Sequence, residues 1–383
     1  MKKFLALIIA LVMALSLVAC GEQKQPDNPD VPDDGQQTAT VKVGFITLHD
    51  ENSTYDLNFI NAAKEAIANL GLTDADYILK TNVPEGQECY ETAMNLVDEG
   101  CNIIFADSFG HEPYMIDAAK EHPEVQFCHS TGTRAHTENL ANYHNAFASI
   151  YEGRYLAGIA AGLKLNEMIE AGKFTADEAK MGYVGAFTYA EVVSGYTSFF
   201  LGARSVCPTV TMDVTFTGSW YDETLEKEGA EKLIQGGCKL ISQHADSLGA
   251  PTACENAGVP NVSYNGSTKD SCPNTFIVSS RIDWAPYYEM CIKAVMDGTE
   301  IPADWTGTLA TGSVVLTDVN ETAAAAGTAE AIAAATEKLE KGEIHVFDCA
   351  NFTTKVDDKV NTFKADYLKL DEAGHITSYM ADV

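Results

Sequence analysis

Basic residues are scarce in this chain of 383 residues. It has 25 Lys and Arg against 55 Asp and Glu, which gives a formal net charge of −30 at pH 7. Binding along a phosphate backbone needs clustered cations, so this balance excludes nucleic acid as a partner. It also disfavours adsorption onto anionic lipid, and we expect a well-solvated surface.

Familiar catalytic and metal-binding motifs are missing as well. The sequence has no G-x-S-x-G, no H-E-x-x-H and no Walker-type phosphate loop, which leaves the common hydrolase and nucleotidase sites without support. Asp50, Glu51 and Asp56 crowd one loop, and a calcium site or a nucleoside hydrolase is the alternative there. Their spacing fits no calcium-binding loop, so we interpret the loop as a solvated acidic turn. We therefore predict that the protein is not an enzyme and holds neither metal nor cofactor.

Cysteine pairs at C-x-x-C spacing are missing too, which argues against a zinc ribbon or a thioredoxin-like site. Apart from Cys20, nine cysteines remain, and an odd number leaves at least one thiol free or paired with another molecule. Cys101, Cys128 and Cys238 lie in or beside apolar runs and are expected to act as small core residues. We expect few disulfides, and the sequence leaves their pairing open.

The first residues are typical of a secretory signal. Lys2 and Lys3 precede an almost wholly apolar stretch, residues 4–17, which is too short for a membrane span of about 20 residues. Residues 17–20, Leu-Val-Ala-Cys, resemble the lipobox of bacterial lipoproteins. The resemblance implies cleavage before Cys20 and a lipid on its sulfur. We predict a signal peptide at 1–19 and an anchor on the extracytoplasmic face of the cell membrane.

A flexible tether is predicted next, over residues 20–40, because this segment is rich in Gln, Pro, Asp and Gly and has little that can pack. Roughly 340 residues follow, too many for one compact core, and none of their segments is long and apolar enough to span a membrane. We predict an N-terminal lobe at 41–147, completed by parts of 275–383, and a C-terminal lobe at 148–274. Residues 275–383 would cross the hinge and complete the lobes, with a helix over 321–341 and strands and turns after it.

Short apolar runs alternate with amphipathic segments from residue 41 to about residue 298. The first run, residues 41–46, predicts a strand, and residues 58–70 predict a helix with one apolar face. A second series of the same pattern starts after a long helix expected near 149–171. Repeated strand–helix units form parallel sheets covered by helices on both faces. The predicted fold is α/β, with two doubly wound parallel-sheet lobes.

The loops after the predicted strands combine aromatic and polar residues. They are residues 49–56, 107–110, 186–189, 217–222 and 244–247. In such folds ligands bind at the carboxyl ends of the strands or between lobes. Two facing rings clamp a planar ligand, with stacking that contributes about 1–3 kcal/mol per base, and an Asp accepts hydrogen bonds from N–H or O–H groups.

These loops and several other segments resemble the basic membrane protein family of substrate-binding lipoproteins. The matching segments, in order, are residues 107–110, 127–132, 151–158, 182–185, 191–195, 220–222, 243–247 and 283–288. The resemblance implies the type I periplasmic-binding fold, with two lobes joined by a hinge. It further implies a monomer that binds a purine nucleoside or a purine base and delivers it to an ABC permease.

The resemblance also implies roles for individual residues. Tyr55 stands where the family often has Trp and would supply a stacking face, while Asn58 opens the following helix. Asp246 would accept hydrogen bonds from the ligand. Asn52 and Ser267 stand where relatives often have Asp, so two acceptors for ribose or a guanine amine are lost. A free base such as adenine therefore stays open as the ligand.

Further ring and backbone groups are implied on both sides of the cleft. The turn of Ser108, Phe109 and Gly110 would meet the edge of the base, and Phe187 and Trp220 would supply the opposing face. The alternative is that Phe109 and Phe187 belong to the lobe cores, with a smaller chance of the same for Trp220.

Other assignments also have structural alternatives. Asp222 is better explained as a helix N-cap, and Asp246 with the residue after it has the same alternative. His129 and His244 are interpreted as structural histidines, and Arg154 is expected in a buried ion pair. Three rival functions stay open: a sugar-binding protein of the same fold, an exported nucleoside hydrolase, and a surface sensor without a transport partner.

Overall fold

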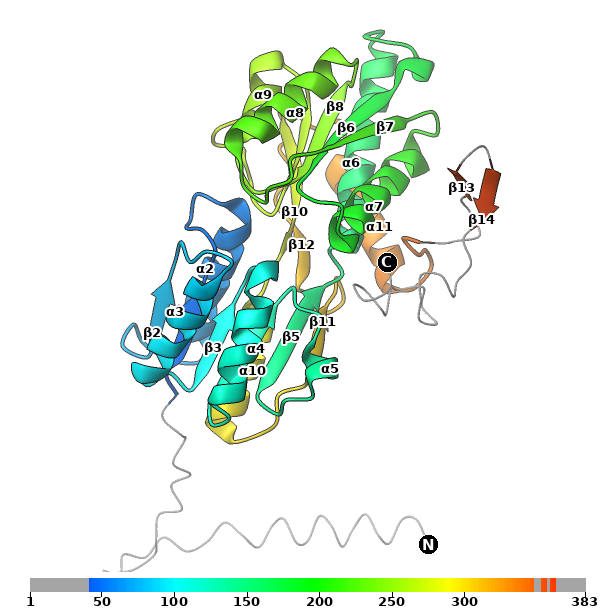
Figure 1. Ribbon diagram of the computed structural model, residues 1–383. Coiled ribbons are helices and arrows are strands. Elements are labelled where there is room, and N and C mark those ends of the chain that lie inside the picture. Colours follow the sequence, from blue (N-terminus) through cyan, green and yellow to red (C-terminus); the bar gives the residue numbers. More distant parts are fainter. Residues whose placement is uncertain (1–40, 348–352, 357–358, 363–383) are drawn as a thin grey trace, which may run out of the picture. The chain divides into compact units, whose positions relative to one another are not determined.

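In the computed structural model, the described residues are 41–347, 353–356 and 359–362. The predicted signal peptide, Cys20 and tether lie outside them, as does most of the tail after residue 347. Two six-stranded sheets organise the described part (Figure 1). None of the helices described there has the length and apolarity needed to cross a membrane.

The first sheet has the strand order β11-β5-β4-β3-β1-β2, and its strands are all parallel. They are β1 (Val43–Ile46), β2 (Tyr77–Lys80), β3 (Ile103–Ala106), β4 (Gln126–Ser130), β5 (Tyr143–Ala148) and β11 (Asp304–Gly307). We call this sheet and the helices packed on it the N-lobe. Those helices are α2 (Thr54–Asn69), α3 (Gln87–Asp98), α4 (Glu112–Glu121), the short α5 (Ala135–Glu138) and α10 (Ala285–Asp297).

The second sheet has the order β12-β10-β9-β8-β6-β7, parallel except for β12. Its strands are β6 (Lys180–Gly185), β7 (Thr211–Phe216), β8 (Leu240–His244), β9 (Asn261–Tyr264), β10 (Phe276–Ile282) and β12 (Val314–Leu316). We call this sheet with its helices the C-lobe. The helices are α6 (Ile150–Glu170), α7 (Ala190–Val206), α8 (Glu223–Gln235), α9 (Gly249–Ala257) and α11 (Thr328–Glu340).

Both sheets are buried on two faces, which confirms the predicted α/β fold. Helices α2 and α10 cover one face of the first sheet, and α3 and α4 cover the other. In the second sheet α6 and α7 cover one face, and α8 and α9 the other (Figure 1). Every residue of β1 and β3 is buried as a result, as expected for central parallel strands.

Within residues 41–347 the chain passes between the lobes three times: from β5 to α6, from β10 to α10, and from β11 to β12. The lobe boundaries drawn from the sequence stay a prediction. Two short 3₁₀ turns, Phe109–His111 and Ala176–Glu178, and a separate pair of strands, β13 (Thr353–Val356) and β14 (Lys359–Thr362), complete the described elements.

Two helices differ from the predicted ranges for local reasons. Helix α2 begins at Thr54, four residues before the predicted start, because the Ser53 side chain accepts the N–H of Asp56 as an N-cap. Helix α11 begins at Thr328, later than predicted, because Gly327 has a φ of 80° that no helix continues through. The Ala-rich residues before it form turns.

Helices α6 and α7 approach backbone to backbone. A Cβ on Gly158 would lie 2.1 Å from the carbonyl oxygen of Phe199, so only glycine permits this contact. Arg154 of α6 is fully buried and donates to neutral oxygens of Tyr183 and Ser242, at 3.1 and 2.6 Å. The hydroxyl and carbonyl oxygens to which its guanidinium donates are neutral, unlike the ion pair expected from the sequence. The eight described cysteines are all free and buried.

Candidate ligand-binding site

A cavity lies between the lobes, at the carboxyl ends of strands from both sheets. Its empty space, counted to where it opens to solvent, is about 350 Å³. The N-lobe contributes Leu48, Tyr55, Ser108, Phe109 and Thr131, and the C-lobe contributes Glu191, Trp220, His244, Asp246 and Tyr264. This position is where doubly wound folds bind ligands.

Aromatic rings from opposite lobes close one side of the cavity. Phe187 packs edge-on against Trp220, with 5.0 Å between ring centroids. Tyr189 contacts Trp220 at 5.9 Å and Phe109 of the other lobe at 5.1 Å. Tyr189 is 40% exposed, so we infer that it covers the cavity from the solvent side. We call Phe109, Phe187, Tyr189 and Trp220 the aromatic rim.

The cavity's charged lining is acidic. Asp246 and Glu191 are 4% and 6% exposed, and no Lys or Arg is among the ten lining residues. Burial raises the pKa of Asp246 well above its usual value, and the nearby carboxylates of Asp56, Glu226 and Glu191 raise it further. The lining therefore offers carboxyl oxygens that accept from N–H or O–H donors of a ligand, and the neutral form of Asp246, which the raised pKa favours, also carries one O–H donor.

The rings of His244 and Tyr264, both lining residues, pack at a tilt of 32° with 4.0 Å between their centroids. Glu191 accepts from the Tyr264 hydroxyl at 3.4 Å and lies 3.7 Å from Nε2 of His244. Burial lowers the pKa of His244, so its imidazole is neutral at physiological pH. A Cβ on Gly195 of helix α7 would lie 2.8 Å from Nδ1 of His244. This ring nitrogen therefore faces helix α7 rather than the cavity.

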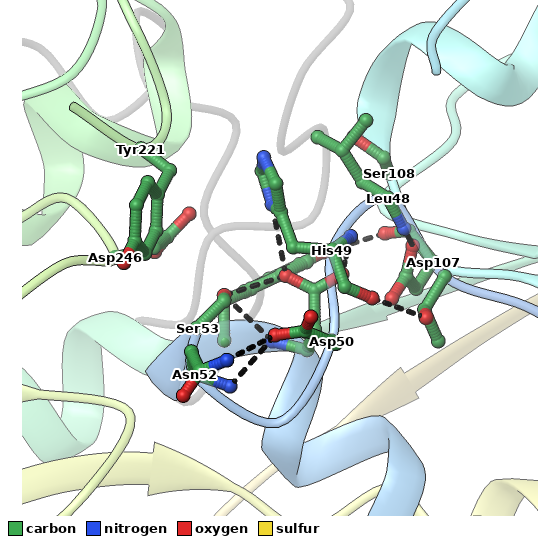
Figure 2. A network of polar contacts seen from close by, with 12 residues as sticks. Leu48, His49, Asp50, Asn52, Ser53, Asp107, Ser108, Tyr221 and Asp246 are labelled. Atoms are coloured by element: carbon green, nitrogen blue, oxygen red, sulfur yellow. Dashed lines mark hydrogen bonds and ion pairs between the residues drawn. The ribbon is translucent and has the colours of Figure 1, made fainter. Parts of the chain in front are cut away.

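The N-lobe wall rests on a network of hydrogen bonds (Figure 2). Asp56 accepts from the backbone N–H of His49 at 2.7 Å and from the hydroxyl of Ser53 at 2.5 Å. Burial raises the pKa of Asp56, but the hydrogen bonds from His49 and Ser53 outweigh it and lower the pKa overall. Asp107 accepts from the N–H of Leu48 at 3.1 Å. These bonds fix the loop between β1 and α2.

Five of the ten ligand-binding residues predicted from the sequence line the cavity: Tyr55, Ser108, Phe109, Trp220 and Asp246. The other five, Asn52, Asn58, Gly110, Phe187 and Ser267, are not among the lining residues. Phe187 supports Trp220 from behind within the aromatic rim.

Two of the other predicted residues are exposed, and the turn at residues 108–110 is hydrogen-bonded within its own lobe. Asn52 is exposed and donates from Nδ2 to Asp50 at 2.8 Å, and Ser267 is exposed. The hydroxyl of Ser108 and the N–H of Gly110 both donate to Glu85, at 2.5 and 2.8 Å. This turn is therefore braced by a carboxylate of its own lobe.

Tyr55 lines the cavity with its hydroxyl already engaged. The hydroxyl donates to the backbone carbonyl of Asp107 at 2.6 Å, and the ring packs on Phe59 at 4.8 Å. The ring is thereby held in one orientation.

Sequence reasoning missed five lining residues: Leu48, Thr131, Glu191, His244 and Tyr264. Each but Glu191 lies at or within two residues of a strand's carboxyl end, and that position is the signal that would have found them. His244 was interpreted as structural, and its packing on Tyr264 agrees while it also faces the ligand space. Thr131 has a φ of 68°, which places a strained backbone at the cavity.

A two-lobed α/β architecture is shared with solved solute-binding proteins. An ABC transporter solute-binding protein from Aeropyrum pernix K1 superposes with a TM-score of 0.64, at 18% identity, covering 89% of this chain and all of that one. That likeness supports the type I periplasmic-binding fold.

The sequence matches the family described as ABC transporter substrate-binding protein, PnrA-like, over residues 44–348. The chain belongs to this family, as the sequence resemblance implied. Its function is therefore that of an ABC transporter substrate-binding protein, a class of binding proteins that works outside the cytoplasm.

Two curated relatives differ in the ligand they are named for. A purine-binding protein of Brucella abortus (strain 2308) is 32% identical over 262 residues, 68% of this chain and 70% of its own length. A putative ABC transporter glucose-binding protein of Haloferax volcanii is 34% identical over 207 residues, which are 54% of this chain and 49% of its own length.

Proposed function

We propose that this protein binds a purine base or purine nucleoside between its lobes and delivers it to an ABC permease, from a lipid anchor at Cys20. The observation that carries the proposal is the aromatic pair Phe109 and Trp220, one from each lobe, on the same cavity as Asp246. Rings on both sides suit a flat heterocycle because stacking needs only a π-face.

The polar lining supports the same ligand class. Purines carry ring N–H and amino donors, and the buried carboxylates of Asp246 and Glu191 accept such donors. The absence of Lys and Arg from the lining residues disfavours nucleotides, whose phosphates need cationic or N–H-rich partners.

We favour the free base over the nucleoside. Asn52 and Ser267 stand where relatives often have Asp, and neither is among the lining residues. Ribose hydroxyls therefore find fewer charged acceptors than the base does. The relative named for purine binding supports the purine class without distinguishing the two.

Isothermal titration calorimetry of the full chain tests the ligand. The panel is adenine, hypoxanthine, guanine, their nucleosides and D-glucose. The proposal expects saturable heat from at least one purine and none from glucose. Glucose is the second candidate because one relative is named for it, and binding of glucose alone would refute the purine assignment. Chromatography of the same mixtures should recover every nucleoside intact, since release of free base would indicate a hydrolase.

Detergent phase partitioning tests the anchor. Wild-type protein made in a lipoprotein-processing bacterium should enter the detergent phase, since two acyl chains bind a bilayer or micelle firmly. Cys20→Ala removes the sulfur that would carry the lipid and should leave the protein in the aqueous phase. Equal partitioning of the two proteins would contradict a lipid at this residue.

A further inference from the structure

The amino end of helix α2 makes direct contact with the C-lobe. Thr54 is the first residue of the helix, and its backbone N–H donates to the backbone carbonyl of Asp246 at 3.1 Å. Its hydroxyl donates to the same oxygen at a longer 3.3 Å. The first N–H groups of a helix have no partner within it, so this contact satisfies a donor that only another segment or water can satisfy.

A second contact follows one turn along the same helix. Asn58 is 8% exposed, and its side-chain amide donates to the backbone carbonyl of Asn265 at 2.9 Å. Asn265 has a φ of 61°, a left-handed conformation that Asn tolerates better than most residues. A Cβ on Gly266 would lie 3.2 Å from Cβ of Thr54, so the two segments are closely packed here. We call Thr54, Asn58, Asp246 and Asn265 the α2 clasp.

We propose that the α2 clasp sets the balance between open and closed lobes before any ligand binds. Both donors belong to the N-lobe and both acceptors are backbone carbonyls of the C-lobe, and the contacts involve no ligand atom. Opening the lobes exchanges these bonds for bonds to water. A hydrogen bond of this kind shifts such an equilibrium by a factor of about 2 to 10. The clasp thereby makes Thr54 and Asn58 positioning residues for binding.

The clasp acts on affinity through the closed fraction. When only a fraction of the molecules is in the binding-competent state, the apparent dissociation constant is the intrinsic one divided by that fraction. Asp246 links the two effects, because its side chain lines the cavity while its carbonyl belongs to the clasp. This inference rests on the class of protein and holds for any ligand of the cavity.

Proline at position 54 is the sharpest test. Thr54→Pro removes the N–H donor, and proline suits the first turn of a helix. Ser53 has φ −81° and ψ 127°, the extended conformation that a residue before proline prefers. Thr54→Ala is the matched control, because it loses only the longer hydroxyl bond and keeps the N–H.

Small-angle X-ray scattering of the ligand-free full chain compares the closed fractions. Thr54→Pro should have the larger radius of gyration, and its apparent dissociation constant for adenine should rise about 2- to 10-fold over that of Thr54→Ala. Asn58→Ala should also raise the radius of gyration and the apparent dissociation constant. This variant replaces Thr54→Pro in the test if the proline variant fails to melt cooperatively.

Identical scattering and affinity for Thr54→Pro and Thr54→Ala would overturn the clasp, as would a wild-type chain that is fully open without ligand. If adenine fails to bind, the affinity comparison uses whichever purine of the panel binds; if none binds, the proposed ligand class is refuted, and the scattering comparison still decides the clasp.

Discussion

The two lobes bury a carboxylate beneath the cavity in different ways. Asp56 in the N-lobe has short hydrogen bonds from His49 and Ser53, and its pKa is lowered despite burial. Glu226 in the C-lobe has longer bonds, 3.2 Å to the N–H groups of Asp222 and Ser247, and burial raises its pKa to about 7. The donors around Asp56 therefore favour its ionised form, while burial outweighs the longer hydrogen bonds to Glu226 and favours its neutral form.

This contrast indicates how the site works. The N-lobe supplies a fixed surface, and the C-lobe supplies acceptors such as Asp246 whose need for donors a ligand can meet. Buried acceptors that lack donors are costly, so the C-lobe should gain most from a donor-rich ligand. The predictions below compare the lobes on this basis.

The largest effect is expected in the pH dependence of stability. The pKa of Glu226 is higher in the folded protein than in the unfolded chain, so its contribution is full below pH 4.5 and is lost as the pH rises through about 7. The rise in pKa from 4.5 to about 7 corresponds to a loss of ~3 kcal/mol in the free energy of unfolding, at 1.36 kcal/mol per pKa unit. Glu226→Gln should remove this loss, which thermal melting between pH 5 and pH 8 measures against wild type.

Asp56→Asn is the matched N-lobe variant. The pKa of Asp56 is lowered on folding, so its stabilising contribution is present above pH 3.8 and is lost as the pH falls further. This variant should melt at a lower temperature than wild type at neutral pH, and its melting temperature should fall less than that of wild type on acidification. Parallel pH profiles for the two variants would contradict the contrast between the lobes.

Loss of the acceptor at Asp246 should weaken binding more than any change in the N-lobe wall. Asp246→Asn keeps the shape of the side chain but replaces one carboxyl oxygen by an NH₂ group that cannot accept, at a cost of about 1–3 kcal/mol in binding free energy. Ser108→Ala is the N-lobe comparison, and should cost less because its hydroxyl is held by Glu85. Calorimetry with adenine measures both, and a larger loss for Ser108→Ala would reverse the assignment.

Removing the C-lobe stacking surface should have a similar or smaller effect. Trp220→Ala is expected to weaken purine binding by about 1–3 kcal/mol, the range for one stacked base. Phe216→Ala is the control, because Phe216 is an exposed ring of the same lobe that does not line the cavity. Unchanged calorimetry for Trp220→Ala would mean that its ring does not touch the ligand.

The smallest effect is expected at Tyr189, where the aromatic rim meets solvent. Tyr189→Ala removes the ring contact with Phe109 across the lobes, a contribution of about 0.5–1.5 kcal/mol. The effect should fall on the dissociation rate measured by stopped-flow fluorescence, with Tyr189→Phe close to wild type. A slower association with unchanged dissociation would argue against a covering role.

Much of the fold was predictable because the strands of buried parallel sheets are continuous apolar runs, and their order alternates with amphipathic helices. The cavity residues that directly follow strands, such as Ser108, Phe109 and Asp246, were predictable for the same reason. Glu191 was not, because it lies in the first turn of α7 and reaches the cavity only through tertiary packing.

Asn58 illustrates a second limit of sequence reasoning. The family resemblance implied it as a ligand-binding residue at the opening of the first helix, and in the structure its amide donates to the backbone carbonyl of Asn265. A sequence pattern gives the side of the helix on which an amide lies. The group that it contacts lies 207 positions further along the chain, and only the tertiary fold brings the two together.

Both acceptors of the clasp are main-chain oxygens, which every amino acid carries. Replacement of the side chain at position 246 can therefore alter which solute is recognised while the strength of lobe closure is kept. In a reporter built on this scaffold, selectivity and the closing signal would be adjustable at separate atoms of one residue.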